Sequence, residues 1–445
     1  MFLLEGHSAP DHATLARFRS IHFAPCSKRI LAEVSNILFD LGEISGKTIF
    51  IDGTKIEANA NKYTFVWKKT VTKNQAKLLI KLADFVAECE QLYDIKIVYG
   101  NVVKIKHLKR LRKKLYALKN AENITFVHGI GKRKTPLQKS IETLEEYLSK
   151  LKEYTQKIHI CGERNSYSKT DNDATFMRMK EDAMGNGQLK PAFNLQHGVD
   201  SEYITWLTIG YQPTDTTTLI PFLKDAGQHL KFKYKNITAD AGYESEENYL
   251  FLEANNQIAF IKPANYEISK TRKYKNDIGK IENMEYDEIS DSYTCKNNRK
   301  LTVSHLRHSK SKTGYVSEKT IYICEDCREC PYKSSCIKGN NCKTPLEERT
   351  KVLQVAKTFI KHRKEDLERI ISDEGVLYRM NRSIQAEGSF GDLKQDMQFR
   401  SYLSKGTANV LAESTLLAIA RNINKLHNKI QNGKTGTHLF PLKSA

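Results

Sequence analysis

Short apolar runs rich in β-branched and aromatic residues recur along this chain, and segments of helical periodicity lie between them. Helical patterns cover Thr216–Leu230 and Ser245–Ala254. A strand, hairpin, helix, strand, helix, strand series of this kind predicts an α/β fold with several parallel strands. The runs that we interpret as strands are Lys47–Ile51, Ala192–Gln196, Tyr203–Ile209, Tyr234–Ala239 and Gln257–Lys262.

Further helices are expected on both sides of this series. Apolar residues recur at helical spacing over Val71–Leu92, over Leu108–Leu118 and over Leu137–Leu151, where Thr135 is the expected N-cap and Pro136 the first helical residue. Helical patterning returns from near Pro345 through Ile371, and then over Tyr378–Asp396 and Ala408–His427. We interpret the apolar stripes as core or helix-pair packing.

The charge balance favours a polyanionic partner. Seventy-one Lys and Arg against 52 Asp and Glu leave a net charge of +19, which suits nucleic acid better than a membrane surface. With 40% apolar residues the chain can bury a sizeable core, and no window approaches the roughly 18 apolar residues of a membrane span. The apolar start meets Glu5 too early for a signal peptide. We therefore expect a cytoplasmic, nucleoid-associated protein.

One helical segment carries an unusually dense run of basic residues without acidic ones. A surface that tracks DNA phosphates and a solvated helix face are both consistent with that run, which cannot specify a base sequence by itself. Its members are Lys104, Lys106, Lys109, Arg110, Arg112, Lys113, Lys114 and Lys119.

Three acidic residues form the candidate catalytic set. Asp52 and Asp240 each follow a strand and precede a glycine within two residues, so both can lie at one edge of the sheet. Glu387 is expected on a helix, with Lys394 two turns further on. Each acid alone is more typical of a turn cap or a solvated side chain. Together they suit a pair of Mg²⁺ or Mn²⁺ ions, which can activate the nucleophile and stabilise the leaving oxygen in phosphodiester cleavage.

Several other polar residues are candidates for the same chemistry. Asp171, Asp173, Asp200 and Asp215 are rival metal ligands of lower rank. His197 either orients the substrate or is a satisfied polar group near a strand end.

The cysteines form a second constellation. CxxC spacing predicts a tetrahedral Zn²⁺ site in a reducing compartment, and unliganded thiols are the alternative. The preferred ligands are Cys295, Cys327, Cys330 and Cys336, with Cys324 and Cys342 as substitutes.

The chain resembles DDE-type insertion-sequence transposases, in the branch typified by insertion sequence 1182. The resemblance rests on Pro10–Arg19, Ile51–Asn61, Lys169–Met177, Ala239–Tyr243 and the Arg382–Lys394 segment. It implies an RNase H-like core, with the first Asp on the first strand, the second near the end of the fourth, and the Glu on a later helix. By motif position these are Asp52, Asp240 and Glu387.

The resemblance also implies an activity. Such enzymes bind element-end DNA, hydrolyse a strand at each end and join the freed 3′-hydroxyl to target DNA, and pairing of two ends implies a homodimer. Relatives often carry Tyr-x₂-Arg-x₃-Glu-x₆-Lys. Here Glu387 and Lys394 fit that spacing, whereas Tyr378 and Arg382 are each displaced. Arg382 and Lys394 are assigned to DNA phosphates together with the basic helix.

These patterns predict a core interrupted by two insertions. Similar transposases usually begin with additional helical residues before the segment that corresponds to Pro10–Arg19, so the resemblance implies an N-terminally short copy. A decayed, non-catalytic DNA-binding remnant is the alternative function. A divalent-metal nuclease unrelated to mobile elements is a third possibility. The expected units are 1–46 (remnant of a helical DNA-binding region), 47–69 (first core strand), 70–160 (basic helical insertion), 161–262 (core), 263–344 (Cys-rich insertion), 345–429 (C-terminal core helices) and 430–445 (basic tail).

Overall fold

The computed structural model describes residues 10–179, 187–339 and 342–439. Two compact units divide these residues. Unit 1 contains the described residues up to 54, from 194 to 400 and from 408 onward, and unit 2 contains residues 55–193 and 401–407. The parts of the expected 1–46 and 430–445 segments at the chain ends lie outside the described residues.

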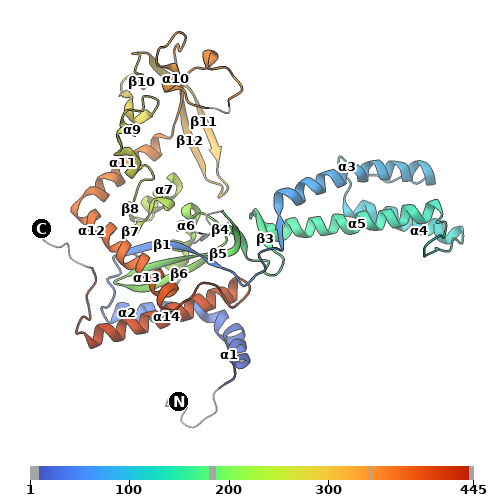
Figure 1. The fold of residues 1–445 in the computed structure, drawn as a ribbon, viewed down its shortest axis with the longest axis horizontal. Coiled ribbons are helices and arrows are strands. Elements are labelled where there is room, and N and C mark those ends of the chain that lie inside the picture. Colours follow the sequence, from blue (N-terminus) through green and yellow to red (C-terminus); the bar gives the residue numbers. More distant parts are fainter. Residues whose placement is uncertain (1–9, 180–186, 340–341, 440–445) are drawn as a thin grey trace. The chain divides into compact units, whose positions relative to one another are not determined.

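A mixed sheet forms the centre of unit 1 (Figure 1). Its strand order is β6-β5-β1-β7-β8, in which β1, β7 and β8 are parallel and β5 and β6 form an antiparallel hairpin. Side chains of β1 such as Ile49, Phe50 and Ile51 are fully buried, as expected for a strand covered on both faces. The expected α/β alternation is confirmed. The strands are β1 (Thr48–Glu57), β5 (Leu189–Asp200), β6 (Tyr203–Gly210), β7 (Asn236–Ala239) and β8 (Ile258–Ile261).

Helices near both ends of the chain bind the same edge strand of this sheet. Ser35 of α2 donates a 2.7 Å hydrogen bond to the Thr205 carbonyl of β6, and Asn422 of α14 bonds both main-chain groups of Ile204. The bounds of the main helices of unit 1 are α1 (His12–Phe18), α2 (Ser27–Asp40), α6 (Leu219–His229), α7 (Glu246–Ala254), α11 (Lys357–Ile371), α12 (Asp373–Arg382) and α14 (Thr407–Gln431).

The expected helix over Tyr378–Asp396 contains two π-helical turns. After α12 come the π-helical η8 (Ser383–Glu387), the short α13 (Gly388–Gly391) and the π-helical η9 (Asp392–Asp396). A π-helical turn accommodates one residue more than an α-helical turn, so each shifts the register of the side chains that follow.

The Cys-rich part of the chain builds an antiparallel sheet with the order β13-β12-β11-β10-β9. Its own small core includes Tyr293, Leu301 and Tyr322. The expectation of helix from Pro345 onward is wrong over Val352–Val355, because this run pairs with the edge of β12 as β13, and α11 begins only at Lys357. The strands are β9 (Glu285–Asp287), β10 (Ser292–Thr294), β11 (Lys300–Lys310), β12 (Val316–Cys324) and β13 (Val352–Val355), and the short helices nearby are α8 (Tyr266–Ser269), α9 (Arg272–Lys275) and α10 (Lys333–Cys336).

Unit 2 consists mainly of three helices, α3 (Lys68–Tyr93), α4 (Ile105–Ala121) and α5 (Pro136–Cys161) (Figure 1). Their apolar stripes meet in one core that includes Leu82, Leu111 and Leu144. Thr135 caps α5 and accepts from the Gln138 N–H, as its sequence predicts. Two small sheet elements complete the unit: β2 (Phe65–Trp67) pairs with β3 (Ser166–Ser168), and β4 (Thr175–Arg178) pairs with the first residues of β5.

Within the residues that the structure describes, no helix is long and apolar enough to cross a membrane.

Candidate active site

Two of the candidate acids lie at the same edge of the unit 1 sheet. Ile51 of β1 is opposite Ala239 of β7 in a parallel register, and Asp52 and Asp240 are the next residues on each chain segment. Each carboxylate accepts a 2.9 Å hydrogen bond from a nearby glycine N–H, Asp52 from Gly53 within β1 and Asp240 from Gly242 in the following 3₁₀ turn. The expectation that this strand stops at Asp52-Gly53 is wrong, because β1 continues to Glu57 and Asp52 lies within it. β7 does end directly before Asp240, so the two aspartates follow the last paired residues of β1 and β7.

Arg382 links the third candidate acid, Glu387, to Asp52. Arg382 Nη2 lies 2.7 Å from Glu387 Oε1, and Arg382 Nη1 lies 3.9 Å from Asp52 Oδ1. The arginine side chain is 17% exposed and Glu387 is 52% exposed. Arg382 therefore stands between two of the three candidate acids and compensates the charge of both.

A π-helical turn makes this contact possible. Arg382 and Glu387 are five residues apart, whereas side chains on one face of an α-helix are three or four apart. The π-helical η8 spans this interval, and its i→i+5 geometry aligns the two side chains. Tyr378 points elsewhere: its hydroxyl donates to Glu374, and its ring packs against Phe260. Lys394 lies half-exposed in η9.

A fourth carboxylate, Asp215, belongs to the same edge. Its Oδ1 accepts hydrogen bonds from Asn194 Nδ2 at 2.8 Å and Gln196 Nε2 at 3.0 Å. A Cβ added to Gly53 would lie 2.8 Å from Asp215 Oδ1, and one added to Gly242 would lie 3.6 Å from its Oδ2. Asp215 therefore lies between the backbones that follow Asp52 and Asp240.

The other rival carboxylates lie in different places. Asp171 and Asp173, in unit 2, accept from the backbone N–H groups of Gly406 and Thr407. Asp200 lies at the far end of β5 and accepts a 2.8 Å bond from the Gly46 N–H. Among the lower-ranked acids, Asp215 is thus the member that the fold brings to Asp52 and Asp240.

The charged groups at this edge of the sheet shift the pKa of Tyr243. Its fully buried hydroxyl donates to Gln196 Oε1. Burial raises the pKa of Tyr243 well above its ordinary value, the charges of Asp215, Asp52 and Asp240 raise it further, and Arg382 lowers it.

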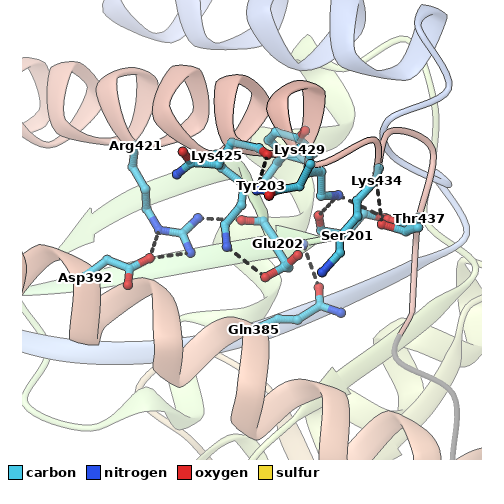
Figure 2. Close-up of polar contacts among 12 residues, drawn as sticks. Ser201, Glu202, Tyr203, Gln385, Asp392, Arg421, Lys425, Lys429, Lys434 and Thr437 are labelled. Atoms are coloured by element: carbon cyan, nitrogen blue, oxygen red, sulfur yellow. Dashed lines mark hydrogen bonds and ion pairs between the residues drawn. The ribbon is translucent and has the colours of Figure 1, made fainter.

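The segment that carries Glu387 is fixed by a polar network (Figure 2). Gln385 Oε1 accepts from the Glu202 N–H at the tip of the β5–β6 hairpin, and Arg421 of α14 donates to the Glu202 carbonyl. Arg421 also binds Asp392 Oδ2 through two nitrogens, each at 2.8 Å, and Lys425 pairs with the Glu202 carboxylate. Both ends of the Glu387 segment are therefore tied to the hairpin and to α14.

His197 packs against the same segment. Its Nδ1 lies 3.0 Å from Ser389 Oγ, and its ring stacks on Phe390 with centroids 4.3 Å apart. Burial, with a smaller contribution from Arg421, lowers the pKa of His197 to about 3. The geometry therefore agrees with a satisfied, neutral packing group rather than with a substrate-orienting one.

Five cysteines gather in the Cys-rich part of unit 1. Cys295, Cys324, Cys327, Cys330 and Cys336 line a cavity of about 20 Å³, which can hold one group the size of an ion or a water molecule. The exposed Cys342 is not among the lining residues. Burial raises the pKa of Cys324 to about 12, and burial also raises that of Cys336, with smaller contributions from Cys295, Cys327 and Cys330.

Among the described residues, neither the carboxylates nor the cysteines form a ready-made metal site. Over the described residues, no group of three or more His, Cys, Asp or Glu is arranged so that it could hold a metal ion as it stands. The donor types nevertheless match the ions expected: carboxylate oxygens suit Mg²⁺, and thiolates suit Zn²⁺. At the sheet edge, the guanidinium of Arg382 lies between the carboxylates of Asp52 and Glu387, so the space between these two acids already holds a positive group.

The basic run lies on the exposed face of α4 in unit 2. His107, Leu108, Leu111 and Leu115 form the buried face of this helix. Lys114 Nζ donates to the Lys96 carbonyl at 2.9 Å. The exposed basic side chains are Lys104, Lys106, Lys109, Arg110, Arg112, Lys113 and Lys114.

Comparison with known proteins gives one match. Residues 294–427 match the family model described as "Transposase DDE domain". Neither the curated proteins nor the solved structures contain a match to this chain. The matched residues include the cysteine cluster, Arg382, Glu387 and Lys394, whereas Asp52 and Asp240 precede them. Together with the mixed α/β architecture, this match supports a DDE-type transposase of the RNase H-like class.

Proposed function

We propose that this protein cleaves the strands at the ends of an insertion sequence and joins the freed 3′-hydroxyl groups to target DNA. The observation that carries the proposal is the register of β1 and β7, which puts Asp52 and Asp240 side by side at the sheet edge to which Arg382 connects Glu387. The branch typified by insertion sequence 1182 and a homodimer that pairs two ends are parts of this proposal.

Asp52, Asp240 and Glu387 are the residues that would hold two divalent ions. Such ions would supply a deprotonated nucleophilic oxygen and stabilise the charge on the leaving oxygen. Asp215, Gln196 and Tyr243 are linked by hydrogen bonds next to Gly53 and Gly242 and would support the backbone beside the two aspartates. In this proposal Arg382 releases Glu387 and turns its guanidinium to a DNA phosphate, which matches its planar array of donors.

Phosphate binding away from the reacting centre is assigned to Lys394 and to the exposed basic face of α4. These cations contribute affinity that falls with salt, because each neutralised phosphate releases counterions. They position DNA without reading its bases.

We further propose that the cysteine cluster binds one structural Zn²⁺. Cys295, Cys327, Cys330 and Cys336 are the preferred ligands, and the lining of the cavity by Cys324 makes it the first substitute. The thiols would lose their protons on binding, which couples zinc affinity to pH.

Asp240→Asn tests the proposed function. The substrate is a duplex that carries the inverted repeat read from the DNA beside the coding region. The variant should bind this duplex nearly as well as the wild type and should lose Mg²⁺-dependent nicking. Asp173→Asn is the matched control, because it makes the same change at an exposed acid that bonds Thr407 and should leave nicking intact.

The outcomes separate the alternatives. Unchanged nicking by Asp240→Asn would remove this residue from the mechanism. Binding without nicking by the wild type, with Mg²⁺ or Mn²⁺ present, would favour the non-catalytic remnant. Nicking without joining of the 3′-hydroxyl to target DNA would favour a metal nuclease unrelated to mobile elements.

A further inference from the structure

The row of residues that contains Asp52 and Asp240 continues onto a third strand. Ile261 of β8 is opposite Ala239 of β7 in a parallel register, and Lys262 is the next residue. The Lys262 N–H donates to the Ala239 carbonyl at 3.3 Å, so the pairing extends to this position. Because neighbouring strands are about 4.8 Å apart, a lysine stands one strand beyond Asp240 at the edge that carries the candidate acids.

Two further cations converge with Lys262 on one aromatic ring. Lys270 Nζ lies 3.6 Å from the centroid of Tyr266, the Arg379 guanidinium carbon lies 5.4 Å from it, and Lys262 Nζ lies 5.5 Å from it. These distances fall within the roughly 6 Å range of cation–π attraction. Three cations therefore lie around this ring: Lys262 directly after β8, Lys270 directly after α8, and Arg379 of α12. We call these three residues and Tyr266 the Tyr266 cluster.

Arg379 connects the cluster to the candidate active site. It lies on α12, one turn before Arg382, which contacts Asp52 and Glu387. Its Nε is buried and has no hydrogen-bond partner among the described residues. A hydrogen bond from Lys270 and the charge of Arg379 lower the pKa of Tyr266 against the opposing effect of burial, so the tyrosine oxygen already lies in a field that favours negative charge.

The carboxylate of Glu267 partly compensates these charges. It lies 2.8 Å from Lys262 Nζ and 3.4 Å from Lys270 Nζ, and its side chain is 62% exposed. Such exposed pairs contribute only about 0–1 kcal/mol, so a multiply charged anion can compete for both lysines. The cluster retains an excess of positive charge beside a strand end where the fold gathers acids.

We propose that the Tyr266 cluster binds a DNA phosphate that flanks the scissile phosphodiester. This inference rests on the proposed function and adds a subsite to it. The acids of β1 and β7 face the reacting phosphate, and Lys262, Lys270 and Arg379 hold a neighbouring one. The tyrosine ring keeps the cations together before DNA arrives, which reduces the entropy that they lose on binding.

The test uses the full-length protein and the inverted-repeat duplex. Single phosphates are replaced by neutral methylphosphonates, one position at a time around the nick, and binding is measured for each duplex. The wild type should lose affinity at specific positions. Lys262→Ala with Lys270→Ala, both at partly or fully exposed positions, should become insensitive at one of them, and its salt dependence should be shallower by about 0.9 per lost contact.

Glu267→Gln is the matched variant of opposite sign. It removes the internal competitor and keeps the side-chain shape, so it should tighten binding by roughly two- to five-fold. Retention of every sensitive position by the double-lysine variant, or weaker binding by Glu267→Gln, would overturn the subsite. A wild-type protein that neither binds nor nicks this duplex would refute the proposed function instead, and the subsite would fall with it.

Discussion

The close approach of backbone and side chains at Gly53 gives the sharpest stability prediction. A Cβ at this position would lie 2.3 Å from Gln196 Nε2 and 2.8 Å from Asp215 Oδ1, so Gly53→Ala forces the amide away. That amide donates to Asn194 Oδ1 at 2.9 Å and to Asp215 Oδ1 at 3.0 Å. A neutral hydrogen bond contributes about 1 kcal/mol and one to a charged acceptor about 1.5–3 kcal/mol. The free energy of unfolding should therefore fall by about 2.5–4 kcal/mol.

Gly227→Ala provides the control of opposite sign. Gly227 lies within α6 and has no atom within 4 Å of an added Cβ. Alanine in a helix is about 0.5–1 kcal/mol more favourable than glycine, so this variant should be slightly stabilised. Urea denaturation followed by circular dichroism measures both variants. Equal or greater stability of Gly53→Ala than of the wild type would refute the packing that we describe beneath Asp52.

Three further predictions concern groups away from the acids. Burial is the main reason that the pKa of Asp366 is raised to about 7, so between about pH 4 and pH 7 the native state keeps a proton that the unfolded state has lost. The free energy of unfolding should therefore fall as the pH rises through this window. Urea midpoints measured against pH should show a flatter profile for Asp366→Asn than for the wild type. Asp392→Ala removes the partly exposed carboxylate that binds the buried Arg421, and it should lower the free energy of unfolding by about 2–3 kcal/mol. Adding Arg421→Met should recover part of this loss in the same urea assay, and no recovery would argue against this ion pair. Elemental analysis should find zinc in the wild type and none in the double variant Cys327→Ala with Cys330→Ala. A wild-type protein without zinc would refute the proposed Zn²⁺ site.

The sequence predicts the end of β7 because its signal is local. The apolar run before Asp240-Ala-Gly242 predicts both β7 and the 3₁₀ turn that follows it. The similar signal at Asp52-Gly53 is misleading, because β1 continues through Gly53 to Glu57. The same reasoning fails for Val352–Val355, since four residues beside a helix are ambiguous between the two periodicities. That short run becomes β13 only because the edge of β12 is there to pair with it.

The site residues divide in a similar way. The sequence contains a signal for Asp215, because Asn194 and Gln196 alternate with apolar residues in β5 and indicate a polar face that a carboxylate can bind. The contact between Arg382 and Glu387 could not be predicted, because the two residues are five positions apart and the sequence between them contains no signal for a π-helical turn. Its position depends on Gln385 and Arg421, whose partners on the hairpin are distant in sequence.

Metal-ion rescue at Asp240 tests the central claim most directly. A thiolate is a poor ligand for Mg²⁺ and a better one for softer ions. Asp240→Cys should therefore lose nicking of the inverted-repeat duplex in Mg²⁺ and regain part of it in Mn²⁺ or Cd²⁺, whereas Asp173→Cys should nick in Mg²⁺ as the wild type does. Wild-type nicking by Asp240→Cys in Mg²⁺, or a loss that neither softer ion restores, would contradict the account.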